Sequence, residues 1–248
     1  MERILYFGIA FSVIFLIIGY VADKILNITT HLSNTEKKKW EANVLGIVFS
    51  CIAGPVGVYC NYYPQNGEVI SSIYGKSDDI VLLLDFACGY FLYDIIVSMI
   101  YFDRATLIHG IACFLVYGLS NYPQPFIHQT AAFFLIFEFS TPFLNMRNIL
   151  LQLKRTDSII FPICTYMFAI SFFTARIVVG IPRSYIFWQD ILDLLFYHEK
   201  NDLDPNHPVG IAYYMLVANT ILNGLNIYWM FLIIQSVTKK RDTKKKKN

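Results

Sequence analysis

Seven stretches of the chain are apolar over most of the length of a membrane-spanning helix. Crossing the hydrocarbon core takes roughly 20 apolar residues, with a range of about 17–25. The stretches are residues 4–22, 44–60, 80–102, 105–119, 127–151, 159–181 and 209–237. The second is interrupted by Gly54, Pro55 and Gly57, and the fourth is short. The pattern predicts an all-α, polytopic transmembrane helical bundle of about seven spans, or six if one of these two does not cross.

Two stretches need a separate interpretation. Residues 185–197 are too few to cross and include Asp190 and Asp193, so we expect an interfacial or re-entrant helix ahead of the last span. No small-x-small cleavage site follows residues 4–22, and their apolar run is longer than that of a usual signal peptide. We therefore expect this first stretch to remain as an uncleaved span.

Composition agrees with a membrane protein. Hydrophobic residues make up 56% of the 248 residues and charged residues only 15%, and the mean hydropathy is +0.48. Soluble domains carry about 25% charged residues, so soluble, disordered and collagen-like classes are excluded. The five cysteines form no CxxC pair and show no metal-ligand spacing, so we expect neither a disulfide framework nor a structural metal site.

Positive charge is distributed unevenly between alternate loops. One set of loops, together with the C-terminal tail, carries 14 lysines and arginines, and the other set carries 4. Because cytosolic loops are enriched in these residues, we expect a luminal N-terminus and a cytosolic C-terminus. Lys245 and Lys246 resemble a dilysine signal for retrieval to the endoplasmic reticulum, which predicts a multi-pass protein of that membrane. The alternative is a plain polybasic tail attracted to anionic lipid headgroups.

Polar side chains recur at helical spacing inside three of the apolar stretches. Ionisable groups at membrane depth are costly and usually face the bundle interior or a watery cavity. We therefore predict one polar-lined cavity that opens toward the cytosol. Its expected lining residues are Tyr90, Tyr93 and Ser98 beside Asp94 in the third stretch, Glu138, Thr141 and Asn145 in the fifth, and Asn219, Asn223 and Asn226 in the last.

Several polar residues also have a structural interpretation. The three asparagines serve helix packing or cavity lining equally well, and an isolated histidine such as His109 is more often structural than catalytic. Arg147 is expected to snorkel, and Arg176 to pair with an acid or snorkel. Asp85 is expected at the loop side or in helix packing. Pro142 is expected to kink the fifth stretch.

Four segments together resemble the TLC-domain family of endoplasmic-reticulum membrane proteins. They are GYFLYD at residues 89–94, His109 with its apolar surroundings, EFSTPFLNMR at residues 138–147, and Arg176 within FFTARI. The resemblance covers about residues 40–240 and is greatest to the small TLC-domain-containing proteins. It divides the chain into a first transmembrane helix with a basic cytosolic loop (1–39), a TLC-like transmembrane domain (40–238) and a basic cytosolic tail (239–248).

The resemblance implies a polytopic protein that handles lipids. Ceramide synthases in the family join a fatty acyl-CoA to a sphingoid base and use a paired histidine and aspartates inside the membrane. Here Gly110 follows His109, so one of the two histidines is missing, and Asp94 is the one acid that fits the family position. The departure argues against acyl transfer without excluding it, because one histidine and one carboxylate still provide a base.

Three functions are consistent with these observations. The first is a protein of lipid homeostasis that binds or senses a lipid or acyl chain in the cavity, which the missing histidine favours. The second is an acyltransferase of ceramide-synthase type with His109 and Asp94 as catalytic residues and acyl-CoA as co-substrate. The third is a lipid carrier or membrane-insertion helper. We expect membrane lipids as partners, with other membrane proteins or a second copy as further candidates, and no nucleic acid, cofactor or metal.

Overall fold

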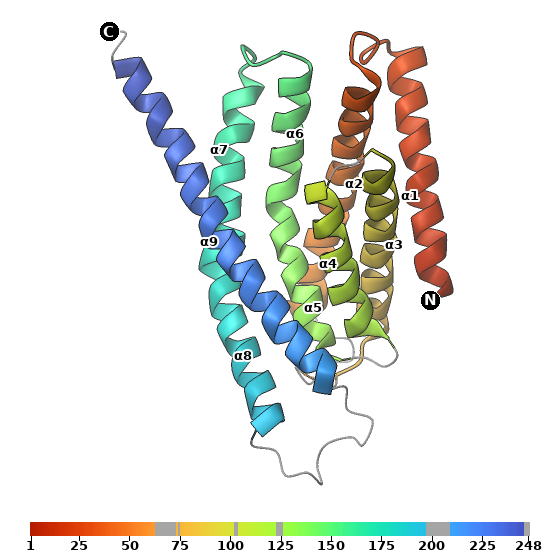
Figure 1. Ribbon diagram of the computed structural model, residues 1–248, viewed down its shortest axis with the longest axis vertical. Helices are drawn as coiled ribbons and strands as arrows, with labels where there is room; N and C mark the ends of the chain where they lie inside the picture. The colour runs from red at the N-terminus through yellow and green to blue at the C-terminus, as the bar shows by residue number, and fades with distance from the viewer. Residues whose placement is uncertain (63–72, 74, 102–103, 123–125, 197–208, 246–248) are drawn as a thin grey trace. The chain divides into compact units, whose positions relative to one another are not determined.

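The computed structural model describes residues 1–62, 73, 75–101, 104–122, 126–196 and 209–245 (Figure 1). Within these residues the chain forms helices and connecting turns but no strands, so the all-α expectation is confirmed. In chain order the elements are α1 (Glu2–Tyr20), the π-helical η1 (Val21–Ile25), α2 (Asn34–Tyr62), α3 (Asp78–Ile100), α4 (Arg104–Asn121), α5 (His128–Phe134), the 3₁₀ helix η3 (Leu135–Ser140), α6 (Thr141–Gln152), α7 (Ile160–Phe172), the π-helical η4 (Phe173–Val179), α8 (Gly180–Phe196) and α9 (Val209–Lys245).

Five helical stretches in the described part of the chain are long and apolar enough to cross a membrane. They are Glu2–Ile25, Asn34–Asn61, Asp78–Ile100, Ile160–Phe196 and Val209–Gln235. The expected short fourth span appears as a shorter apolar helix, Thr106–Asn121. The expected fifth span is helical but divided into α5, η3 and α6. The chain is therefore a multi-pass membrane protein built as a helical bundle.

Two local expectations differ from the structure. Pro55 does not interrupt the second helix, because α2 runs continuously from Asn34 to Tyr62 around it. The helix expected at residues 185–197 begins earlier, at Gly180, and follows η4 without a break. No loop separates this helix from the sixth span. The hydropathy of the sequence falls near Gly180, but the helix continues. Tyr197 lies outside the described residues, and the interfacial placement of α8 stays a prediction.

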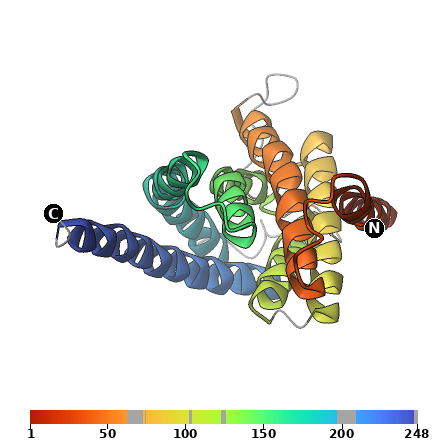
Figure 2. The same ribbon diagram turned by 90° about the horizontal axis from the view of Figure 1, so that it is seen from above.

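The chain forms two compact units, Met1–Thr165 and Tyr166–Asn248, and the division falls within α7. In the first unit α3 packs against α1, α2, α4 and α5. Figure 2 shows α1, α2 and α3 side by side at one edge of this unit. Completely buried residues such as Leu45, Phe49 and Leu84 form its core.

Small residues allow α1 and α3 to approach closely. A Cβ added to Gly89 would overlap the Cβ of Phe7 and lie 3.0 Å from the backbone nitrogen of Gly8. Close approach at small residues is a common way for membrane helices to pack, because lipid supplies no hydrophobic force between them. This contact holds α1 against the helix that carries Asp94.

In the second unit α9 packs against α8 and η4. The buried face of α8 includes Phe187, Ile191 and Leu194. Ala212 and Met215 are buried apolar residues of α9. Apolar packing therefore holds this helix pair together, and polar contacts add to it as described below.

Candidate functional site

Tyr90 of α3 lies where α2, α3 and α6 converge. Its ring stacks on that of Phe49 with centroids 3.8 Å apart and an interplanar angle of 3°. A Cβ added to Gly46 of α2 would overlap the side-chain nitrogen of Asn145 and lie 3.2 Å from the Tyr90 hydroxyl. The hydroxyl and the amide therefore meet at a backbone position that only glycine leaves open.

Two carboxylates approach the same tyrosine. Asp94 is 9% exposed, and its Oδ2 would lie 3.1 Å from a Cβ at Gly110 of α4. Both Asp94 and Glu138 interact electrostatically with the Tyr90 hydroxyl. Tyr90 and Asp94 of α3 are thus associated with two residues of the fifth stretch. Asn145 meets the Tyr90 hydroxyl at Gly46, and Glu138 interacts with it electrostatically. We call these four residues the Tyr90 cluster.

Glu138 lies in the 3₁₀ segment η3, directly before α6. Pro142, expected to kink this stretch, is at the start of α6, directly after the change from 3₁₀ to α geometry. A change from α to 3₁₀ geometry in the middle of a helix often marks a functional hinge. The change of helix type places Glu138 and the half-buried Thr141 at the junction.

Tyr93 and Ser98 continue the buried face of α3. Tyr93 is 1% exposed, and its hydroxyl has no hydrogen-bond partner among the residues that the structure describes. The hydroxyl interacts electrostatically with Asp94 and with Glu41 of α2. A buried hydroxyl without an acceptor carries a desolvation penalty. Ser98 is also buried.

His109 is exposed on α4, one residue before the glycine that Asp94 touches. Its ring meets Phe91 edge to face at 5.9 Å. The sulfur of Cys113 lies 3.8 Å from His109 Nδ1 and 3.7 Å from Nε2. In the described residues, no group of three or more histidine, cysteine or acidic side chains could hold a metal.

The sequence model of the TLC domain matches residues 39–235, most of the chain. The chain belongs to the TLC-domain family. An uncharacterized TLC domain-containing protein of Schizosaccharomyces pombe is 27% identical over 234 residues, which are 89% of this chain and 73% of that protein. TLC domain-containing protein 4 A of Dictyostelium discoideum is 27% identical over 221 residues, 84% of this chain and 78% of the relative.

A third relative is an uncharacterized TLC domain-containing protein of Saccharomyces cerevisiae. It is 30% identical over 175 residues, which are 68% of this chain and 52% of that protein. This TLC-domain chain therefore spans about half the length of the Saccharomyces cerevisiae relative.

The three asparagines of this TLC-domain protein bond within the second unit. Asn223 donates from Nδ2 to Ser184 Oγ of α8 and to the backbone and side-chain oxygens of Asn219, each at 2.9 Å. Asn226 accepts from Arg176 Nη1 at 3.0 Å. The asparagines were interpreted as serving either helix packing or cavity lining, and the hydrogen bonds observed are those of helix packing. That they share a cavity with the Tyr90 cluster stays a prediction.

Two arginines of the TLC domain, Arg147 and Arg176, contact aromatic rings. The partners observed for Arg176 are the amide of Asn226 and the ring of Phe172, whose centroid lies 4.9 Å from the guanidinium carbon. Arg147 was expected to snorkel. Its guanidinium lies 5.5 Å from the ring centroid of Phe161, which adds a cation–π contact.

Sequence reasoning missed two neighbours of the candidate site. Cys113 is four residues after His109 on the same helix, so the i, i+4 spacing was available as a signal. Glu41 is buried, pairs with Lys38 at 2.7 Å and lies against Gly19 of α1. It precedes the apolar run of α2 by less than one turn, where an acid normally indicates a helix end outside the membrane.

An apolar groove lies between α1, α2 and α3 and has a volume of about 450 Å³. Its walls are Phe7, Ile52, Val56, Tyr59, Cys60, Asp79, Leu82, Leu83 and Phe86. Phe86 stacks on Phe49 with centroids 5.6 Å apart, and Phe49 in turn stacks on Tyr90. An aromatic column thus joins the groove to the Tyr90 cluster. None of the residues predicted to line a cavity lines this groove.

Proposed function

We propose that this TLC-domain protein binds a membrane lipid and acts in lipid homeostasis. The observation that carries the proposal is the association of Asp94, Glu138 and Asn145 with Tyr90 inside a largely apolar bundle. Ionisable groups at membrane depth are rare and usually face a site of function. A lipid headgroup or linkage that both donates and accepts hydrogen bonds has the chemistry to bind beside such a cluster.

The apolar groove supports the acyl-chain part of the proposal. It is lined almost entirely by apolar side chains, with Asp79 as the acid in its wall. A hydrocarbon chain in this groove would contact Phe86, which leads through Phe49 to Tyr90. The proposal places the chain of an amphiphile in this groove, on the far side of the Phe86–Phe49 stack from Tyr90.

Photo-crosslinking tests this placement. The protein is incubated in nanodiscs with a phospholipid that carries a diazirine in its acyl chain, and labelled peptides are identified by mass spectrometry. We expect wild type to be labelled at Val56 and Leu83. Labelling of the groove should be lost in Val56→Trp, because the larger side chain fills it. Ile14→Trp, at an exposed position on α1 that does not line the groove, is the matched control. Equal labelling in the two variants would contradict the proposal.

We also propose residence in the endoplasmic-reticulum membrane, with the N-terminus luminal and the C-terminus cytosolic. The support is the bias of Lys and Arg between alternate loops and the pair Lys245 and Lys246. Lys246 lies outside the described residues, and for Lys245 the backbone alone is described. Replacing both lysines with serine tests retrieval, because an unchanged distribution would show that these lysines are not the signal.

A second candidate function is acyl transfer. It is favoured by the position of Asp94 against α4 next to His109, and by the thiol of Cys113 beside that imidazole. His109 would be the base or nucleophile and acyl-CoA the donor. His109→Ala separates the two functions, because it would abolish turnover but leave binding at the Tyr90 cluster intact.

A further inference from the structure

Arg176 of the second unit lies in the π-helical segment η4, between α7 and α8. The segment reads FTARIVV and contains neither glycine nor proline, so no residue of unusual backbone freedom accounts for its wider turn. π-helical turns are rare within α-helices and occur frequently at functional sites. The geometry therefore singles out the surroundings of Arg176 as a candidate site of the second unit.

Two contacts orient the Arg176 guanidinium. Its carbon lies 4.9 Å from the centroid of the Phe172 ring, and Phe172 is itself buried. Its Nη1 donates to Asn226 Oδ1 of α9 at 3.0 Å. Because a guanidinium is planar and rigid, a ring beside it and an amide at one nitrogen together restrict its orientation. The cation is half-buried and is held in place before a ligand binds.

Asn226 adds a hydrogen-bond donor beside this cation. The side chain is completely buried. Its oxygen faces the guanidinium, which can only donate, so the assignment of the amide oxygen and nitrogen is fixed. Among the residues that the structure describes, Asn226 Nδ2 has no hydrogen-bond partner. A buried N–H without an acceptor carries a desolvation penalty, which an acceptor at this position would remove.

A cation and an open N–H on the neighbouring amide are complementary to an oxyanion. Guanidinium groups match the geometry of carboxylate and phosphate, and hydrogen bonds to a charged partner are roughly twice as strong as neutral ones. Arg176 lies five residues before the apolar stretch 159–181 ends, at most about 8 Å along the helix. An amphiphile can bring its anionic head to this level while its chain stays in the bilayer, whereas a free anion would lose hydration without burying a chain.

The first unit also contains a buried polar network, but its open atoms have the opposite polarity. Asp85, expected at the loop side or in helix packing, is completely buried. Its Oδ1 accepts from Asn121 Nδ2 at 2.8 Å and from the Tyr122 hydroxyl at 3.0 Å, and His128 Nε2 donates to Asn121 Oδ1 at 2.7 Å. We call these four residues the Asp85 network. Its buried atoms without a partner in the described residues, Asp85 Oδ2 and His128 Nδ1, are acceptors, so they do not complement an oxyanion.

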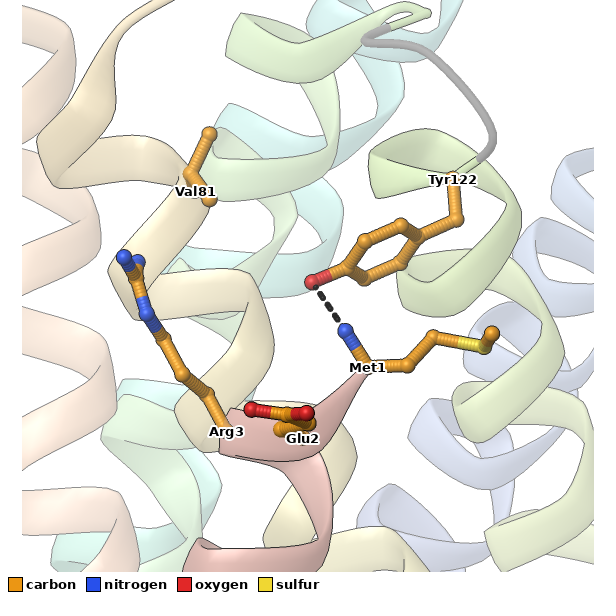
Figure 3. Close-up of a pocket in the computed structure, with 5 residues that line it drawn as sticks. All are labelled: Met1, Glu2, Arg3, Val81 and Tyr122. Atoms are coloured by element: carbon orange, nitrogen blue, oxygen red, sulfur yellow. Dashed lines mark hydrogen bonds between the residues drawn. The ribbon is translucent and has the colours of Figure 1, made fainter.

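A hollow of about 350 Å³ beside this network is a second place where cations occur. It is lined by Met1, Glu2, Arg3, Val81 and Tyr122 (Figure 3). The Tyr122 hydroxyl accepts from the Met1 amine at 2.8 Å and donates to Asp85, so its own hydrogen is already used. An anion in this hollow would also face the carboxylate of Glu2. Arg3 therefore serves as the comparison arginine for Arg176.

We propose that Arg176 and Asn226 form an oxyanion site within the second unit, which takes the carboxylate or phosphate group of a membrane amphiphile. Asn226 Oδ1 holds the guanidinium, while Asn226 Nδ2 and the guanidinium bind the anionic oxygens. The site uses residues of η4 and α9 and is independent of lipid binding at the Tyr90 cluster. Failure of either site in an experiment therefore leaves the other one standing.

Native mass spectrometry of the full-length protein in a maltoside detergent tests the proposal, because this detergent contains neither carboxylate nor phosphate. The probes are oleate, dioleoyl phosphatidic acid and the neutral ester methyl oleate. Asn226→Asp keeps the oxygen that holds Arg176, but it replaces the open donor with an oxygen and adds a negative charge. We expect this variant to bind an anionic probe roughly ten- to hundredfold more weakly than wild type and methyl oleate equally well. Gln189→Glu, the same change at an exposed position of α8, should bind all probes as wild type does.

The anionic probe that loses affinity identifies the source of the ligand. Oleate indicates a fatty acid and phosphatidic acid a phospholipid, and either result or both supports the site. Arg176→Gln should lose the same probe, and Arg3→Gln should not. Anion binding equal to wild type in Asn226→Asp, or an equal loss of methyl oleate, would overturn the proposal.

If Asn226→Asp does not fold, photolabelling of wild type decides. Oleate and phosphatidic acid that carry a diazirine near the anionic group are used as labels. Adducts should map to peptides that contain Arg176 or Asn226, and the unlabelled anion should compete with them whereas methyl oleate should not. The absence of adducts on these peptides would overturn the proposal.

Discussion

The ring of Tyr90 lies parallel to that of Phe49, with centroids 3.8 Å apart and planes 3° from parallel. This stack fixes the Tyr90 hydroxyl at Gly46, where the amide of Asn145 also ends. The helices α2, α3 and α6 therefore meet where the Tyr90 hydroxyl and the Asn145 amide lie against Gly46. The candidate site depends on this close packing as much as on its acids.

Gly46→Ala tests that packing. The added Cβ would overlap the Asn145 amide and crowd the Tyr90 hydroxyl. Overpacking of this kind typically destabilises by about 1–3 kcal/mol, so we expect a lower unfolding midpoint and less bound lipid. Gly224→Ala on α9 is the control, because no atom of the described residues lies within 4 Å of its added Cβ. Equal midpoints in the two variants would show that the Asn145 side chain moves aside easily and that close packing at Gly46 does not hold the site together.

Gly89→Ala tests the attachment of α1 to α3. Its Cβ would overlap that of Phe7, and backbone atoms of α1 cannot move aside as a flexible side chain can. We expect a loss of about 1–3 kcal/mol in stability, measured as denaturant or thermal unfolding. Gly118→Ala, with Cys88 Sγ at 3.8 Å as its nearest neighbour, should be tolerated. A wild-type midpoint for Gly89→Ala would mean that α1 is held by other contacts.

Asn223→Ala tests the polar contact between α8 and α9. The change removes the donor to Ser184. Hydrogen bonds between membrane helices average about 0.6 kcal/mol, so we expect a small loss of stability with lipid binding unchanged. Thr220→Ala is the control, since its exposed hydroxyl bonds within its own helix. Loss of lipid binding at unaltered stability would instead favour cavity lining by the asparagines.

Topology is tested with a tag at the C-terminus. In sealed microsomes we expect protease to remove the tag, because the loop bias of Lys and Arg predicts a cytosolic end. A tag fused to the N-terminus should be protected until detergent opens the membrane. The reverse pattern of protection would invert the orientation proposed for every loop.

The shared face of Tyr90, Asp94 and Ser98 could be read from the sequence, because helical periodicity is a local property. The Asp85 network could not. Asn121, Tyr122 and His128 lie in or next to a short connection between apolar runs, and the fold alone brings them to α3. The continuous helix through η4 and α8 was missed for a related reason. Hydropathy indicates how deeply a segment is buried in the membrane, not where a helix ends. It falls after residue 181, although the helix continues there.

The most direct test of lipid binding at the Tyr90 cluster is to quantify the lipid that co-purifies with wild type and with Tyr90→Phe. The variant removes one hydroxyl and keeps the ring that stacks on Phe49. Because a hydrogen bond contributes about 0.5–1.5 kcal/mol, we expect the bound lipid class to be retained about two- to tenfold less well at unchanged stability. Tyr6→Phe, at an exposed position on α1, should retain it as wild type does. Equal retention of the same lipids by all three proteins would contradict binding at this cluster.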